Sequence, residues 1–126
     1  MDNSLGNYCA DWYFWLRIIF ENPKIGIIEE VLCKYRRHSN SLTKSSFYLN
    51  SVGDKNVVSK AIEIIENYNY DDNLITKAKY EYGRRIYECL KYSYSERYFM
   101  KFIKHIVESF MNRTARKLLL DKMSKK

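Results

Sequence analysis

The sequence is poor in residues that break or cross-link a chain. Its 126 residues include one proline, four glycines and three cysteines. So little proline and glycine excludes long flexible linkers and low-complexity disorder. The cysteines are odd in number and lack C-x-x-C spacing, which argues against a disulfide framework or a zinc site and favours a reducing cytoplasm.

Long apolar runs are also absent. No stretch approaches the roughly 18 to 20 apolar residues that span a bilayer, and the polar start has no signal-peptide core. Nevertheless, 46% hydrophobic and 16% aromatic residues suffice for a packed core in a chain of single-domain length. We therefore expect a globular cytoplasmic protein whose only membrane contact would be peripheral, at the inner face.

The positive charge is unevenly distributed. The net charge is +7, and residues 97–126 alone carry nine bases and two acids, so the remainder of the chain is nearly neutral. A nucleic-acid-binding domain normally spreads its bases over a face built from several elements. The sequence therefore argues against a nucleic-acid partner.

The first part of the chain predicts mixed structure. Residues 11–20 are dense in large apolar groups and predict a short buried helix with Asp11 at or near its N-terminus. Residues 24–28 and 31–36 are rich in β-branched and aromatic residues and predict one or two short strands. The polar residues 38–46 predict a loop.

The second part predicts only helices. Apolar residues recur at three- and four-residue spacing within 57–68 and 75–89, and the Asn- and Asp-rich residues 67–73 separate the two helices. Ser93 and Glu96 have the spacing of a capping box, which predicts the start of a third helix. We expect that helix to bury Phe99, Phe102, Ile103, Ile106, Phe110 and Met111.

Three segments of the first part carry a family resemblance. They are Asp-Trp-Tyr-Phe-Trp-Leu-Arg at 11–17, Lys-Ile-Gly-Ile-Ile-Glu-Glu-Val-Leu at 24–32 and Tyr-Arg-Arg-His-Ser-Asn-Ser-Leu-Thr at 35–43. In this order and spacing they resemble the C-terminal end of the catalytic domain in family 2 glycosyltransferases of the GT-A fold. The fold expected is thus mainly α with a short β segment: residues 1–46 form the acceptor-side end of a GT-A α/β domain, and residues 47–126 form an α-helical bundle.

The resemblance gives Asp11 a catalytic role. It matches the carboxylate that acts as general base on the acceptor hydroxyl, which is a poor nucleophile until its proton is removed. Ala10 occupies a position where the family usually has glutamate, so the acidic neighbour of that base is missing. Asp is also among the best N-cap residues, and a helix N-cap is the competing interpretation of Asp11.

The resemblance implies roles for three further residues. Arg36 and Ser41 would bind the diphosphate of a nucleotide-sugar, and His38 would approach a divalent metal, Mg or Mn. A solvated basic turn is the competing interpretation of these residues. Trp12 and Trp15 are expected in the core rather than as platforms for a sugar.

The chain lacks the other half of such an enzyme. It contains no Asp-x-Asp and no alternating strands and helices that could bind a nucleotide. The complete enzyme would transfer a sugar from a nucleotide-sugar to a glycan or lipid-linked acceptor, in cell-surface polysaccharide synthesis.

We predict that these 126 residues alone are inactive and bind no metal. Either a fragment of the enzyme or a small protein that keeps this module fits the sequence, and in both cases an exposed apolar face would favour a homo-oligomer.

A second interpretation is a non-catalytic helical interaction module, which would dimerise or bind a membrane. Residues 97–126 combine an apolar stripe with bases, the layout of a helix that lies on an anionic membrane surface. A helix that covers a core has the same layout, and we prefer it because aromatic stripes are usually interior. His105 is expected to be a surface or boundary residue without a catalytic role.

Overall fold

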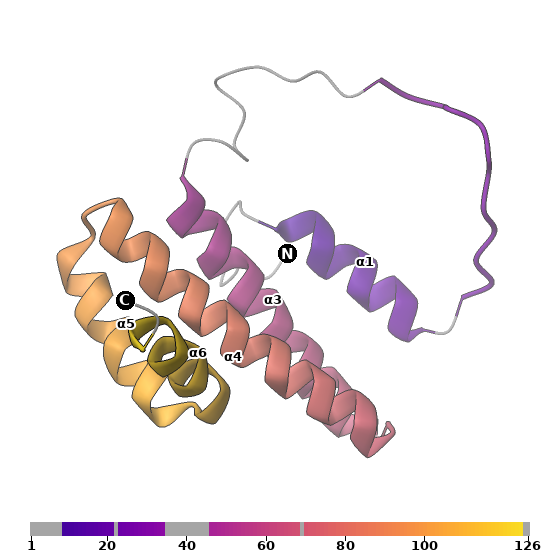
Figure 1. The fold of residues 1–126 in the computed structure, drawn as a ribbon. Coiled ribbons are helices and arrows are strands. Elements are labelled where there is room, and N and C mark those ends of the chain that lie inside the picture. Colours follow the sequence, from indigo (N-terminus) through magenta and orange to yellow (C-terminus); the bar gives the residue numbers. More distant parts are fainter. Residues whose placement is uncertain (1–8, 22, 35–45, 69, 125–126) are drawn as a thin grey trace.

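Helices make up most of the described chain. The computed structural model describes residues 9–21, 23–34, 46–68 and 70–124. In chain order the helices are α1 (Ala10–Phe20), α3 (Phe47–Asn67), α4 (Asp72–Ser95), α5 (Phe99–Met111) and α6 (Arg113–Met123) (Figure 1). The mainly helical class and the helical bundle are therefore confirmed. Within the described ranges, no helix is both long and apolar enough to cross a bilayer.

The bundle is built around α4. Helix α3 lies along one side of α4, whereas α5 and α6 pack on α4 and on each other (Figure 1). Its core mixes apolar and polar side chains. The buried apolar residues are Tyr48, Val57, Ile65, Ile86, Cys89, Leu90 and Ala115, and the buried polar ones are Ser46, Ser51, Lys55, Ser93, His105 and Ser109. Burying a polar group costs free energy unless the group finds a hydrogen-bond partner.

The N-terminus of α3 is capped from two sides. The hydroxyl of Ser46 accepts a hydrogen bond from the Leu49 N–H at 3.1 Å. Glu96, which follows α4, accepts from the Ser46 hydroxyl at 2.6 Å and from the Tyr48 N–H at 3.0 Å. A carboxylate at a helix N-terminus is also stabilised by the helix dipole. Glu96 thus joins the end of α4 to the start of α3.

The expected capping box at Ser93 is wrong. Ser93 is fully buried inside α4, and Glu96 is the C-cap of that helix rather than part of a new one. The Tyr98 N–H donates to the Ser93 carbonyl at 2.8 Å, and the Arg97 N–H donates to the Tyr94 carbonyl at 3.2 Å. These two bonds form a Schellman motif, with Arg97 in the left-handed region at φ 62°. Helix α5 therefore starts later, at Phe99.

The start of α6 packs closely against α4. Asn112 is the N-cap of α6, and its side-chain oxygen accepts from the Ala115 N–H at 3.1 Å. A Cβ placed on Gly83 of α4 would lie 2.5 Å from both Asn112 Oδ1 and Thr114 Cβ. Only glycine allows this approach of the two helices.

The first part of the chain is less buried than expected. Helix α1 contains no buried residue, so the prediction of a buried helix is correct for the helix and wrong for its burial. Residues 23–34 are exposed and form neither helix nor strand. Neither of the one or two short strands predicted at 24–28 and 31–36 is found in these residues, because a strand needs a partner for its backbone hydrogen bonds and the other described residues are mainly helical. Residues 35–36 lie outside the described residues.

Candidate functional site

Asp11 lies in the first turn of α1, with an exposed side chain. The N-cap of this helix is Cys9, whose carbonyl accepts from the Tyr13 N–H at 3.2 Å, so the interpretation of Asp11 as the N-cap is wrong. One carboxylate oxygen of Asp11 accepts from the Trp12 N–H at 2.9 Å. The carboxylate is open to an incoming hydroxyl, as a general base must be.

The other residues predicted for the site, Arg36, His38 and Ser41, lie outside the described residues. Trp12 and Trp15, expected in the core, are half exposed on α1.

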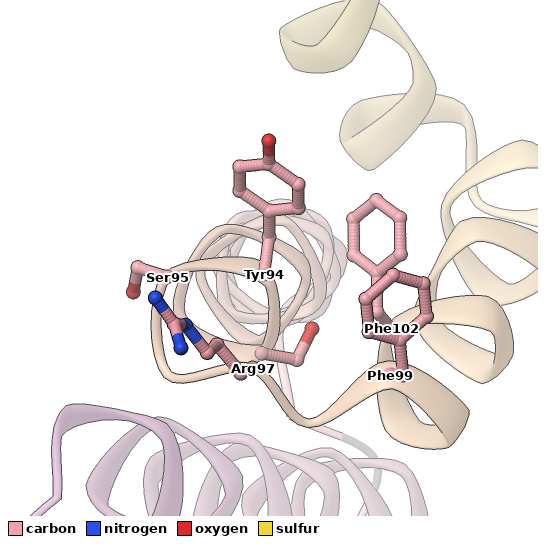
Figure 2. A pocket seen from close by; sticks show the side chains of 6 residues that line it. Tyr94, Ser95, Arg97, Phe99 and Phe102 are labelled. Atoms are coloured by element: carbon pink, nitrogen blue, oxygen red, sulfur yellow. The ribbon is translucent and has the colours of Figure 1, made fainter.

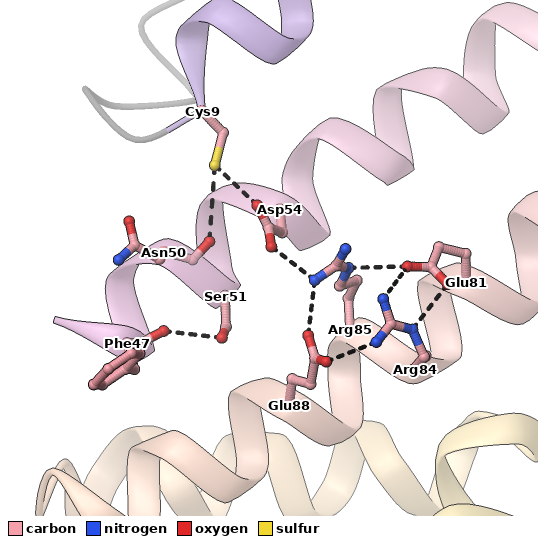
Figure 3. A network of polar contacts seen from close by, with 9 residues as sticks. All are labelled: Cys9, Phe47, Asn50, Ser51, Asp54, Glu81, Arg84, Arg85 and Glu88. Carbon is pink, nitrogen blue, oxygen red and sulfur yellow. Dashed lines mark hydrogen bonds and ion pairs between the residues drawn. The ribbon is translucent and has the colours of Figure 1, made fainter. Parts of the chain in front are cut away.

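Two contacts at its ends attach α1 to the bundle. At its N-terminus the Cys9 thiol donates to Asp54 of α3, with 3.0 Å between Sγ and Oδ1 (Figure 3). At its C-terminus the Phe20 ring lies 5.5 Å from the ring of Tyr70. Burial, and next the bond to Asp54, raise the pKa of Cys9 to about 12, so this thiol stays protonated at neutral pH and is a poor nucleophile.

Asp54 also belongs to a network of ion pairs between α3 and α4. Arg85 Nη1 lies 2.8 Å from Asp54 and 2.9 Å from Glu88 (Figure 3). Arg84 pairs with Glu88 at 2.9 Å and with Glu81 at 2.6 Å. The bond from Arg84 is the main cause that lowers the pKa of Glu81. Because each charge has an opposite neighbour, the network fixes how the two helices lie and leaves no carboxylate poised for acid–base chemistry.

The most buried titratable cluster joins α3 to α5. Lys55 Nζ lies 3.1 Å from Glu108 Oε2, and the same oxygen lies 2.7 Å from His105 Nδ1. On its other side the His105 ring meets Tyr48, with 3.3 Å between Nε2 and the hydroxyl. His105 is buried, so the expectation of a surface or boundary residue is wrong.

Burial decides the protonation of this cluster. It lowers the pKa of His105, although Glu108 opposes that shift, so the ring is neutral at neutral pH. Hydrogen bonds from His105 and Lys55 lower the pKa of Glu108 against the effect of its burial. A neutral ring that donates from Nδ1 to Glu108 accepts from the Tyr48 hydroxyl at Nε2, and burial raises the pKa of that hydroxyl. The ion pair between Lys55 and Glu108 is thus extended by two hydrogen bonds, from His105 to Glu108 and from Tyr48 to His105.

Sequence reasoning missed this cluster, although one signal for it was present. Lys55 follows Tyr48 by seven residues and precedes Ile62 by seven, so it occupies the same face of α3 as both. A base on the inner face of a helix needs a buried acid. The matching acid, Glu108, comes from a different helix and is not linked to Lys55 by any local pattern.

A pocket of about 480 Å³ lies at the turn between α4 and α5 (Figure 2). It is lined by Ser93, Tyr94, Ser95, Arg97, Phe99 and Phe102. Arg97 is its only charged residue, and none of these side chains is a carboxylate, thiol or imidazole. The pocket offers contact surface but no group that could act as a catalytic base.

The described residues do not form a metal site. No three His, Cys, Asp or Glu side chains come together there as ligands would. Tight binding of a divalent cation needs several such ligands. The described residues therefore offer no ligand set of this kind.

Comparisons with known proteins gave no relative. The sequence matches no protein-family model, and no similar protein was found among curated sequences or among solved structures.

Proposed function

We propose that residues 1–46 are the acceptor-side end of a family 2 glycosyltransferase domain of the GT-A fold, with residues 47–126 as its helical extension. The proposal starts from the three sequence segments at 11–17, 24–32 and 35–43. It is supported by one structural observation, the distribution of apolar side chains around α1.

Helix α1 is apolar on two sides. Its half-buried side carries Tyr13, Leu16 and Phe20, whose spacing fits one face packed on α3. Trp12, Trp15 and Ile19 have the same spacing on another face and are between 50% and 59% exposed. A helix that is apolar all round is normally buried between two layers. The bundle provides one layer, and the proposed GT-A domain supplies the other.

The exposed segment after α1 fits the same explanation. Ile27 and Val31 are about 90% exposed, and Ile25, Ile28 and Leu32 are between 68% and 72% exposed. Four of these five residues are β-branched, which suits a strand in a sheet. In the proposed enzyme this segment pairs with strands of the GT-A domain, which would satisfy its backbone groups and cover its side chains.

The chemistry proposed for Asp11 needs an accessible carboxylate. Asp11 removes the proton of the acceptor hydroxyl while that oxygen attacks the anomeric carbon of the donor sugar, and the nucleoside diphosphate leaves. A positioned base contributes about 10²- to 10⁴-fold to the rate of such a step. The donor is a nucleotide-sugar, and the acceptor is a glycan or a lipid-linked glycan of the cell surface.

The reading frame upstream of Met1 tests the proposal directly. We expect it to encode alternating strands and helices with an Asp-x-Asp in the same frame. In the protein that includes this half, Asp11→Asn should lower kcat by about 100-fold or more, whereas Asp71→Asn, an exposed residue before α4, should leave it unchanged. An upstream region without such a half would refute the proposal.

The isolated chain gives a second test. We predict that the 126 residues alone turn over no nucleotide-sugar and bind no nucleoside diphosphate at micromolar concentration, which calorimetry and a release assay can measure. Turnover by this chain would contradict the assignment of nucleotide binding to a separate half.

A further inference from the structure

Helix α5 buries polar residues and exposes large apolar ones, the reverse of an ordinary amphipathic helix in water. The residues that it buries in the bundle are His105 and Ser109. Its solvent side carries large apolar residues spaced three or four apart, which are between 51% and 84% exposed: Met100, Ile103, Val107, Phe110 and Met111. We call these five residues the α5 stripe. The expected burial of Ile103, Phe110 and Met111, and of the equally exposed Phe99, is wrong.

The polar cluster explains this orientation. Glu108 and His105 must face Lys55 and Tyr48, because a buried Lys55 without its carboxylate would be strongly destabilising. Residues 105 and 109 lie one turn apart on the same face, so the opposite face of α5 points to solvent. An amphipathic helix in water normally has the reverse arrangement. Exposure of the α5 stripe to water is therefore unfavourable, and a partner that covers it would be stabilised by burying its apolar area.

An apolar groove extends this surface. A cavity of about 510 Å³ lies between α4, α5 and α6, and Phe110 of the α5 stripe lines it together with Phe102 and Ile106. The other lining residues are Tyr87, Leu90, Lys91, Tyr94, Leu119 and Met123. The exposed apolar area therefore runs from the α5 stripe into the groove. Contiguous patches of this kind mark protein or membrane contacts.

Exposed bases lie on α5 and α6, two of the helices that line the groove. Lys101 and Lys104 belong to α5 itself. Arg113, Arg116 and Lys117 are exposed on α6 and line a shallow pocket together with one acid, Asp121. The acid nearest to the stripe in sequence, Glu108, already pairs with Lys55 and His105. The two helices thus combine an exposed apolar area with an excess of positive charge.

The charge identifies the occupant. A second copy of the chain would bring the same bases against each other, and repulsion of like charges opposes such a contact. An anionic lipid surface meets the bases with phosphates and offers the α5 stripe an apolar layer at the depth that interfacial helices reach. We propose that α5 and the outer side of α6 bind the surface of an anionic lipid bilayer, with the α5 stripe inserted among the acyl chains. This inference does not depend on the proposed glycosyltransferase function.

Cosedimentation of the full chain with lipid vesicles tests this proposal. Vesicles that contain phosphatidylglycerol should bind the chain at least about tenfold more tightly at low salt than vesicles of phosphatidylcholine alone. Met100→Asp combined with Val107→Asp should weaken binding at least about tenfold, because both residues lie in the α5 stripe. Circular dichroism should show an unchanged helix content, since both side chains are more than half exposed.

A matched pair of substitutions controls for added charge. Leu74→Asp with Tyr80→Asp adds the same two charges at exposed positions of α4 outside the stripe, and binding should remain. Lys104→Glu with Arg116→Glu should weaken binding and reduce its dependence on salt. Binding that survives the α5 variant but is lost in Trp15→Asp would place the membrane contact on α1 and overturn the proposal. Absence of vesicle binding, with a dimer in light scattering that the α5 variant abolishes, would identify a second copy as the occupant.

Discussion

Residues 46–124 and residues 9–34 differ in how their structure is supported. In the bundle the N-termini of α3, α4 and α6 have side-chain caps, and ion pairs join α3 to α4 and α3 to α5. In residues 9–34, α1 has one covered side, and the segment that follows is exposed throughout. Both regions are rich in apolar residues, so composition alone does not tell a self-supporting unit from one that needs a partner. What distinguishes them is whether other elements of the chain cover those residues.

The buried ion pair should dominate the stability of the bundle. Glu108→Ala leaves Lys55 and His105 without their carboxylate, and we expect the free energy of unfolding to fall by about 3 kcal/mol, the low end for a broken buried pair, because Glu108 is partly exposed. Urea unfolding followed by circular dichroism measures this loss.

An exposed ion pair supplies the control. Glu63→Gln breaks the pair with Lys60 within α3, where both partners are exposed, and should change the stability by less than about 0.5 kcal/mol. Equal effects of the two substitutions would contradict the structural role of the buried cluster.

The same Gly→Ala substitution can be made once in each region. Gly83→Ala should destabilise the protein by about 2 kcal/mol, because a methyl group there would push against Asn112 and Thr114. Gly26→Ala should have almost no effect, since a Cβ at Gly26 has no atom within 4 Å. Thermal unfolding of both variants measures the difference. A stable Gly83→Ala protein would mean that α6 does not approach α4 as closely as described.

A buried hydroxyl should be dispensable. Ser109 Oγ is buried and has no hydrogen-bond partner among the described residues, so Ser109→Ala should raise the free energy of unfolding by about 1 kcal/mol. Ser93 is equally buried, but its hydroxyl donates to the Leu90 carbonyl at 2.8 Å. Ser93→Ala should therefore give no such gain in the same urea titration, and a similar gain in both would show that the unpaired hydroxyl is not the cause.

The smallest effect should be a dependence on pH. Because burial lowers the pKa of His105 below its ordinary value of 6.5, the unfolded chain binds more protons than the folded one just below that pH. Stability should therefore fall as the pH drops below about 6.5, and the lowered pKa of Glu108 adds a further loss below 4.5. His105→Gln should flatten the first part of this profile. Urea titrations at several pH values will show it, and an unchanged profile would mean that His105 titrates normally.

Local patterns predicted the long helices α3 and α4 but not where α3 begins or where α4 ends. Helix α3 was expected from residue 57, yet it begins at Phe47, because its first turns bury Ser51, Gly53 and Lys55 and so lack an apolar period. The end of α4 was missed because Arg97 adopts the left-handed conformation that glycine usually provides. The first error arises where buried polar residues replace the apolar period, and the second where a non-glycine residue adopts the conformation that ends a helix.

The orientation of α5 could not be predicted from its own sequence. A stripe of Phe, Ile and Met at helical spacing normally indicates the buried side. Here the partners of His105 and Glu108 lie on α3, more than 50 residues earlier, and they decide which side of α5 faces inward. Of the residues predicted for the site, the structure places Asp11 alone, at an exposed start of a helix, whereas Arg36, His38 and Ser41 are outside the described residues.

Hydrogen exchange of backbone amides, followed by mass spectrometry on the full chain, most directly tests the contrast between the two regions. Protection reports the free energy of local opening, which is low where few side chains are buried. We predict slow exchange along α3, α4, α5 and α6, and fast exchange in α1 and in residues 24–34. Protection of α1 equal to that of α4 would contradict our central claim that the first region needs a partner that the bundle does not provide.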